Sequence, residues 1–554
     1  MSFIHNTNQQ MYLFDPYYGL TETELKYLKE SWAEVFANEI FPMINEDRFS
    51  VLYSDNPATR PNNPVNVNMG LIMLREMFVQ TDEEAQTSLY FDIRYKYALH
   101  TTSFKVQPVS KNSLSNFRCL NYKYTQETGR DLIKEEIESH AKTFSKLLEI
   151  NQNTIRMDSM MISSSCRKLS RLEIVYSCLQ RVLKEISDID ESIVPDKYKV
   201  YLKEGHRNQV IYRSKDTEVD QRLKAVIEDA VFIYDLFVDT DHSESEAFRN
   251  FARMLGEQTI RTKDSVNIIP SKVIASESLQ NPTDPDATYR KKGNKANIGY
   301  VANIVETFDD DNAIITSYDL QKNIYSDQQF SKDTIDNLGK QEEKLTVITD
   351  GAFYSEEISI KAAENNIEMV PTGLVGRTQE SNLDYTGFDI DEENHEVLKC
   401  REHCVPLGSS YDADKGKYTV KFPKDICSNC SHRVNCPVNE QKKCYVLYLS
   451  EKKYHREKLI VRMGTDAYKE IADKRSGIEG IPSVLRRRYD VDHLPVKGLI
   501  RSKVHFGFKI SAINCKRFIK AMKKKENKPK DSFVFNHLLE VFSFQRTFYN
   551  FSRV

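Results

Sequence analysis

Acidic side chains interrupt two apolar segments that have the composition of β-strands. Asp158 lies in the middle of TIRMDSMMI (154–162), and Asp350 directly follows LTVIT (345–349). A carboxylate on a buried strand is costly unless it is ion-paired, hydrogen-bonded or bound to a metal ion. The pattern therefore points to chemistry that uses carboxylates as ligands. For either position alone, an acid that caps the turn after its strand is the simpler alternative.

A third acid, Glu479, lies between two arginines in ADKRSGIEGIPSVLRRRYD (472–490). Arg475 precedes it by four residues and Arg486 follows it by seven, so a helix would place all three on one face. Such a face suits a metal-bound carboxylate flanked by guanidinium groups that bind phosphate. The alternative is an ordinary solvated helix, and Pro482 is expected to kink the helix just past the acid.

Half of the ten cysteines are clustered in one segment. Two thiols in a CxxC turn can share one tetrahedral Zn²⁺, and a distant pair can complete the site. The segment FPKDICSNCSHRVNCPV (422–438) is poor in apolar residues, so a structural metal is expected to hold it together. Reduced, unligated thiols are the alternative. The favoured ligands are Cys400, Cys427, Cys430 and Cys436, with Cys404 or His403 as the alternate fourth ligand.

Positive charge is concentrated towards the C-terminus. The whole chain has a formal net charge of -3, yet residues 451–530 hold a large excess of lysine and arginine, which predicts a surface that faces a polyanion. A solvated helix with a flexible basic tail would give the same composition. The candidate phosphate contacts are Arg475, Arg486, Arg487, Arg488, Lys516 and Arg517, with Arg377 as a weaker candidate.

Composition narrows the class of protein. At 554 residues, with 40% hydrophobic and 29% charged residues, the chain suits a soluble globular protein of several domains. Apolar runs are too short for a membrane span, and the N-terminus lacks the pattern of a signal peptide. We therefore expect a cytoplasmic protein with reduced cysteines.

The elements that must position these residues follow from periodicity, and they predict an α/β fold. Residues 1–150 read as helical, with Thr21 and Glu24 as a capping box, and helical periodicity returns from 167. A strand hairpin is predicted over 297–321, with its turn at the three aspartates 309–311. The run LTVIT has the apolar composition of a central strand, and residues from about 445 onward are expected to be helical.

Taken in order, these features resemble a known family. The order of features along the chain is that of the DDE transposases of bacterial insertion sequences. It consists of RMDS, a strand hairpin, VITDGAFYSEE, a cysteine-bearing insertion and Arg475-x3-Glu479-x6-Arg486. The resemblance is to the group with a Tyr-x2-Arg-x3-Glu-x6-Lys signature. In this chain Ala472 occupies the tyrosine position and Arg486 the lysine position.

The resemblance implies a site and an activity. Asp158, Asp350 and Glu479 would form the catalytic triad and bind two Mg²⁺ ions, with Asp158 bridging both. The enzyme would bind the terminal inverted repeats of its element as a homodimer, cleave the DNA ends and join them to target DNA, at the nucleoid of a bacterial cell. A nuclease of the same fold, or an inactive transposase-derived DNA-binding protein, are the competing interpretations.

The resemblance also implies a domain plan. It predicts an RNase H-like catalytic core with a large helical insertion and a small zinc-knuckle-like insertion. The expected domains are a helical N-terminal DNA-binding domain (1–150), the core (151–390, with the helical insertion at about 167–280), the cysteine-rich zinc-binding insertion (391–445) and the C-terminal part of the core with basic DNA-binding helices (446–554).

Overall fold

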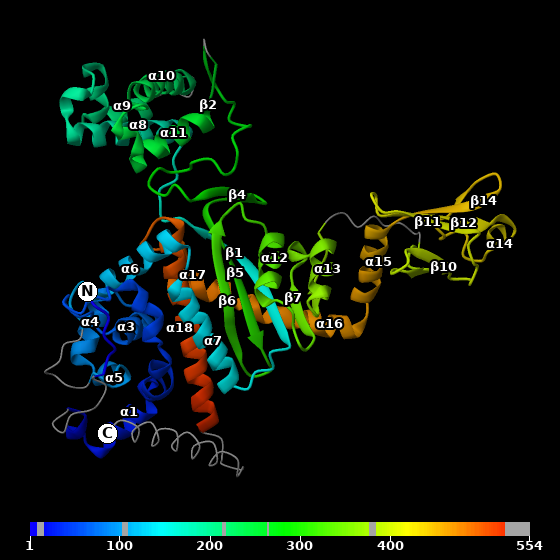
Figure 1. Cartoon of the computed structure of the whole chain (residues 1–554), viewed down its shortest axis with the longest axis horizontal. Helices are drawn as coiled ribbons and strands as arrows, with labels where there is room; N and C mark the ends of the chain where they lie inside the picture. The colour runs from blue at the N-terminus through cyan, green and yellow to red at the C-terminus, as the bar shows by residue number, and fades with distance from the viewer. Residues whose placement is uncertain (8–15, 102–108, 213–217, 263–264, 376–383, 527–554) are drawn as a thin grey trace.

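A computed structural model gives the fold of the chain, a mixed α/β structure built on a six-stranded sheet (Figure 1). It describes residues 1–7, 16–101, 109–212, 218–262, 265–375 and 384–526. Among these residues, no helix is long and apolar enough to cross a membrane.

The central sheet has the order β4-β5-β1-β7-β8, with β6 also paired to β5. β1 runs antiparallel to β5 and parallel to β7, and β7 runs parallel to β8. The predicted hairpin is present as β5 and β6, and the Asp309 carboxylate accepts hydrogen bonds from the turn backbone at Asp311 and Asn312. The strands are β1 (Thr154–Ser163), β4 (Thr288–Lys292), β5 (Lys295–Phe308), β6 (Ala313–Lys322), β7 (Leu345–Thr349) and β8 (Ile367–Pro371).

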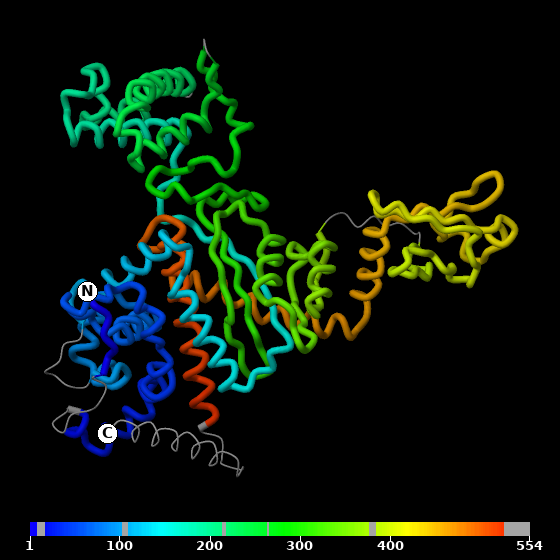
Figure 2. Tube along the Cα trace, in the orientation of Figure 1, coloured from blue at the N-terminus to red at the C-terminus, as the bar shows by residue number. Residues whose placement is uncertain are grey.

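The N-terminal helices pack directly against the sheet and the long helix α18. Thr21 and Glu24 form the predicted capping box at the start of α1. Phe144 of α7 stacks on Phe518 of α18 with ring centroids 4.3 Å apart. One hydrophobic cluster includes side chains from the N-terminal helices, β5, β6, α17 and α18, so the N-terminal region shares its core with the sheet. The trace of the N-terminal helices runs beside that of α18 (Figure 2). The helices are α1 (Glu22–Glu30), α2 (Trp32–Val35), α3 (Val65–Phe78), α4 (Asp82–Phe91), α5 (Ile93–Ala98), α6 (Ser113–Thr128), α7 (Leu132–Leu147), α17 (Gly480–Tyr489) and α18 (Leu499–Glu526).

A second core lies between the sheet and two helices that follow the hairpin. Met157, Val301 and Val347 from three strands pack with Phe330 of α12 and Ile358 of α13. These helices are α12 (Asp327–Leu338) and α13 (Glu356–Glu364). The sheet is therefore covered on both faces, as expected for parallel strands that are apolar throughout.

Two further lobes interrupt the central unit (Figure 1). The first, between β1 and β4, has its own hydrophobic cluster and corresponds to the helical stretch expected after residue 167. Its elements are α8 (Arg171–Ile189), α9 (His206–Ile211), α10 (Val219–Phe237), α11 (Glu246–Gln258), β2 (Thr259–Arg261) and β3 (Val266–Ile268).

The second lobe contains the cysteines and is mostly β-structure. β11, β12, β14 and β13 form one sheet, and β9 pairs with β10. Its core contains Tyr418, Val420 and Leu447, each at most 1% exposed. The lobe therefore has an apolar core of its own, to which the strands on either side of the cysteine-rich segment contribute. Its elements are β9 (Phe388–Asp391), β10 (Glu396–Cys400), β11 (Gly408–Asp412), β12 (Lys417–Pro423), α14 (Lys424–Ser428), β13 (Asn439–Glu440) and β14 (Cys444–Ser450).

The expectation of helix from about residue 445 is wrong for the first residues of that stretch. Cys444–Ser450 is strand β14, because its apolar side chains complete the core of the cysteine lobe. Helices follow only afterwards, as α15 (Glu451–Met463) and α16 (Asp466–Asp473), and the short helix η10 (Lys474–Ile478) then leads to α17.

Candidate active site

Two of the three acids lie on neighbouring parallel strands. Arg156 of β1 pairs with Ile348 of β7. Asp158 and Asp350 each lie two residues further along the sequence, so they occupy corresponding positions. Adjacent strands lie about 4.8 Å apart, which brings the two carboxylates to the same edge region of the sheet. The negative charge of Asp350 acts on Asp158, which agrees with this proximity.

Asp158 is a largely buried carboxylate with two donors. Its Oδ1 accepts hydrogen bonds from the Ser159 backbone N–H and from Arg475 Nη2, each at 3.0 Å, and its side chain is 17% exposed. Burial raises the pKa of Asp158 above its ordinary value; Arg475 opposes this shift and Asp350 adds to it. Ser159, on the opposite face of the strand, donates instead to Asp327 at 2.7 Å.

Asp350 is exposed. Its side chain does not cap the turn after its strand, which was the alternative explanation for an acid at this position. It stands at the N-cap of the short helix η9 (Gly351–Phe353), yet its side chain makes no capping hydrogen bond. Gly351 is required next to it, because a Cβ there would collide with the backbone of Gly373. The close approach of these two loops holds the Asp350 backbone at the end of β7.

Glu479 is connected to Asp158 through Arg475. Arg475 Nη1 donates to Glu479 Oε1 at 3.0 Å while Nη2 of the same guanidinium donates to Asp158. The Glu479 side chain is 60% exposed, whereas that of Arg475 is only 14% exposed. A positive group thus lies between two of the three predicted acids.

The helix predicted around Glu479 is divided in two; Arg475 and Glu479 still share a face, as their ion pair four residues apart shows, and only the expectation for Arg486 is corrected. Arg475 belongs to η10, and α17 starts only after Glu479. Pro482 falls in the first turn of α17, where the missing N–H is tolerated, so it does not kink a helix past the acid. Arg486 instead donates to the Met161 carbonyl of β1 at 2.7 Å and pairs with Asp492 at 3.2 Å.

The predicted phosphate contacts differ in their surroundings. Arg487 and Arg488 are exposed, and neither has an acidic partner among the residues that the structure describes. Arg377 lies outside the described residues.

Two of the predicted contacts, Lys516 and Arg517 of α18, are turned towards the protein. Arg517 binds the fully buried Glu306. Lys516 Nζ lies 5.5 Å from the centre of the Tyr489 ring, and burial, with a contribution from Arg488, lowers the pKa of Lys516 to about 8. Both side chains are half-buried and directed at groups of the protein, because α18 packs between the sheet and the N-terminal helices.

Sequence reasoning missed one charged residue near the acids, Arg156. It lies two positions before Asp158, and its guanidinium pairs with Glu306 and also donates to the Lys474 carbonyl in η10. A basic residue inside an apolar strand was the available signal. Its partners could not be found without the strand register, which places Arg156 directly opposite Glu306.

The cysteines lie near one another in the second lobe, all with free thiols. Cys400, Cys427 and Cys436 pack at the edge of its apolar cluster beside the buried Cys404. Burial, with the charges of the neighbouring thiols, raises the pKa of Cys427 to about 12. Across the described part of the chain, however, no three His, Cys, Asp or Glu side chains are grouped so that they could hold a metal ion, so the predicted zinc site gains no support.

The three acids Asp158, Asp350 and Glu479 are likewise not grouped so that they could hold a metal ion. The position of Arg475 gives the physical reason. Carboxylate oxygens are the donors that Mg²⁺ prefers, so Asp158, Asp350 and Glu479 suit such an ion in type and charge. In this arrangement the Arg475 guanidinium is the cation that bonds two of them. The three carboxylates therefore suit a divalent cation in chemical type, whereas their grouping in this structure does not hold one.

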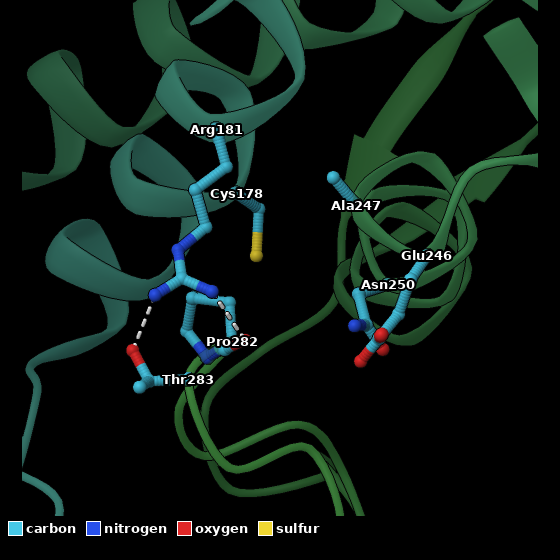
Figure 3. A pocket seen from close by; sticks show the side chains of 7 residues that line it. All are labelled: Cys178, Arg181, Glu246, Ala247, Asn250, Pro282 and Thr283. Carbon is cyan, nitrogen blue, oxygen red and sulfur yellow. Dashed lines mark hydrogen bonds between the residues drawn. The ribbon is translucent and has the colours of Figure 1, made fainter. Parts of the chain in front are cut away.

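A pocket occurs in a different part of the molecule, the helical lobe (Figure 3). Its volume is about 300 Å³, and Cys178, Glu246 and Asn250 are among its lining residues. Arg181 lines it and donates to the Pro282 carbonyl at 2.6 Å, which ties α8 to the loop between β3 and β4. None of the three acids lines this pocket.

Comparison with known proteins gives one match. Residues 403–519 match the family model described as "Transposase DDE domain". The matched segment contains Arg475 and Glu479 and begins after Asp158 and Asp350. No curated protein and no solved structure matches the chain. The match of this segment supports the resemblance of the sequence to DDE-type transposases.

Proposed function

We propose that the protein is a transposase that binds the terminal inverted repeats of its own insertion element, cleaves the DNA ends and joins them to target DNA. The observation that carries this proposal is the strand register, in which Asp158 of β1 and Asp350 just past β7 take corresponding positions, with Glu479 linked to Asp158 through Arg475. The family match supplies the reaction class.

The catalytic core is proposed to be RNase H-like. Three antiparallel strands, β6, β5 and β1, continue into the parallel strands β7 and β8, with the first acid on the central strand of the five. This order supports the proposal, since it brings an acid in the middle of β1 next to an acid at the end of β7. The helical lobe and the cysteine lobe are then insertions, the first after β1 and the second before the last acid.

Asp158, Asp350 and Glu479 are proposed to hold Mg²⁺. When bound, two such ions activate the attacking oxygen and stabilise the leaving oxygen of a phosphodiester. The chain's own contribution is to desolvate Asp158, to present Asp350 without a capping hydrogen bond, and to keep a guanidinium within reach of the scissile phosphate. Arg475 is suited to that last role, because it can exchange a carboxylate for a phosphate oxygen.

DNA is the proposed partner, with a homodimer formed when two ends are brought together. Arg487 and Arg488 support a DNA surface beside the site, since they follow Glu479 closely and are exposed. Sequence-independent phosphate contacts of this kind make binding sensitive to salt. By its resemblance to insertion-sequence transposases, the protein would act on DNA in the bacterial cytoplasm.

The proposal is tested with a duplex that carries the inverted repeat flanking the gene. We expect Mg²⁺-dependent nicking at the repeat end by the wild type and loss of at least about 10³-fold in Asp350→Asn. Asp336→Asn is the matched control, because Asp336 is an acid of α12 that pairs with Lys361 and should leave nicking unchanged. Absence of nicking in the wild type would refute catalysis and favour a DNA-binding protein. Nicking without joined products would favour a nuclease.

A further inference from the structure

A buried ion network joins the strand of Asp158 to the core behind it. The Arg156 side chain is 9% exposed, and its Nε and Nη2 each lie 2.6 Å from Glu306 Oε2. Glu306 is fully buried on β5, directly opposite Arg156, and its other oxygen binds Arg517 of α18. One carboxylate thus receives two guanidinium groups from two different elements.

The same Arg156 side chain also reaches the segment that carries Glu479. Its Nη1 donates to the Lys474 carbonyl, the first residue of η10, at 2.6 Å. Its guanidinium carbon lies 4.1 Å from the centre of the Phe308 ring, which fixes the plane of the group. All three guanidinium nitrogens of Arg156 are therefore bonded: Nε and Nη2 to Glu306, and Nη1 to η10.

Gly477 in η10 is shaped to receive this guanidinium. A Cβ at Gly477 would overlap Arg156, although the residue itself is otherwise exposed. Only the absence of a side chain lets η10 approach β1 this closely. Gly477 lies between Arg475 and Glu479, so the contact fixes the stretch that presents both.

Stability alone does not account for the network. Burying an ion pair costs about as much in desolvation as the attraction returns, so a well-packed apolar substitute is often equally stable. What the charged arrangement supplies is direction, since a planar guanidinium bonds in fixed directions to a carboxylate and a carbonyl. That property is useful where the position of a neighbouring backbone matters.

We propose that Arg156 is a positioning residue that holds η10, through the Lys474 carbonyl and Gly477, in the place from which Arg475 bonds both Asp158 and Glu479. The inference rests on the proposed function, because it concerns the same three carboxylates. It assigns to Arg156 no contact with DNA or metal. Groups that orient ligands in this way typically change affinity or activity by about 10–100-fold when removed.

The test uses the full chain with two variants, Gly477→Ala and Arg156→Lys, and two measurements. Gly477→Ala is the main variant, because position 477 is exposed and the three atoms nearest to a Cβ there all belong to the Arg156 guanidinium. We expect Mn²⁺ affinity, followed by electron paramagnetic resonance without DNA, to fall about 10-fold or more. We also expect kcat for nicking to fall by about 10–100-fold while KM for DNA stays unchanged. Arg156→Lys should lie between the wild type and Gly477→Ala, since it keeps the charge and loses the fixed geometry.

A matched buried ion pair serves as the control. Lys509 of α18 pairs with Glu76 of α3 at 3.3 Å, with side chains 9% and 5% exposed. Lys509→Met should change thermal stability without changing Mn²⁺ affinity or kcat. Wild-type Mn²⁺ affinity and kcat in Gly477→Ala would overturn the positioning role alone. A wild type that neither binds Mn²⁺ nor nicks DNA would overturn the proposed function, and this inference with it.

Discussion

Removing Arg475 should strengthen metal binding and weaken catalysis at the same time. In the metal-free chain the Arg475 guanidinium bonds Asp158 and Glu479, each at 3.0 Å. A divalent cation that uses these carboxylates must displace it. Arg475→Ala removes that competition, together with a positive charge that repels the incoming ion.

The magnitude follows from how exposed each partner is. The bond to Asp158 joins side chains 14% and 17% exposed, so it has the value of a charge-assisted hydrogen bond, about 1.5–3 kcal/mol. Glu479 is 60% exposed, and its bond contributes only about 0–1 kcal/mol. Each 1.4 kcal/mol is a factor of about ten, so Mn²⁺ affinity should rise roughly 10-fold or more.

The assay is a titration of DNA-free protein with Mn²⁺ at pH 8, followed by electron paramagnetic resonance. Arg486→Ala is the control, since Arg486 bonds Met161 and Asp492 and touches neither carboxylate. Nicking by Arg475→Ala should fall even as Mn²⁺ affinity rises, because the guanidinium is also proposed to bind the phosphate. Unchanged or weaker Mn²⁺ binding in Arg475→Ala would refute the competition.

Three further outcomes are expected. Burial raises the pKa of Asp158, so this carboxyl favours folding below its unfolded pKa and destabilises the folded state as pH rises through its folded pKa. In thermal unfolding, Asp158→Asn should therefore gain stability relative to the wild type from pH 4 to pH 8. A difference in stability that stays constant with pH would contradict this. Leu447→Ala should destabilise the cysteine lobe by about 2–5 kcal/mol. A zinc chelator should leave the resistance of the lobe to limited proteolysis unchanged. Proteolysis that increases with the chelator but not with Leu447→Ala would show that a metal holds the lobe. Arg487→Ala combined with Arg488→Ala should reduce the dependence of DNA affinity on salt by about 2 in the log–log slope, measured by fluorescence anisotropy, and an unchanged slope would remove both from the DNA surface.

Local sequence patterns were sufficient to predict the parts of the fold that depend on neighbours in the chain. The Thr21 capping box, the strand around Asp158 and the hairpin turn at Asp309 were confirmed. In each case the deciding interaction lies within a few residues, so periodicity and turn chemistry determine it.

Features that depend on distant contacts were not predictable. The segment 422–438 looked too polar to fold without a metal, because the core of its lobe comes from the neighbouring strands β12 and β14. The half-buried state of Lys516 and Arg517 was not visible either, because it depends on how α18 packs against the sheet.

The candidate site shows the same division. Asp158, Asp350 and Glu479 could be named because acids next to apolar strands and between arginines are visible in the sequence. Arg156 could not be given a role, since its partner Glu306 is set by strand register and its contact with Gly477 by tertiary packing. The break between η10 and α17 reflects glycines on both sides of Glu479, which the helical spacing alone does not weigh.

The most direct test of the central claim is anomalous diffraction from crystals of the full chain grown with Mn²⁺. The account predicts an anomalous peak bounded by the carboxylates of Asp158, Asp350 and Glu479, with the Arg475 guanidinium displaced from between them. A peak elsewhere, or saturating Mn²⁺ with these carboxylates still bonded to Arg475 and no peak beside them, would contradict it.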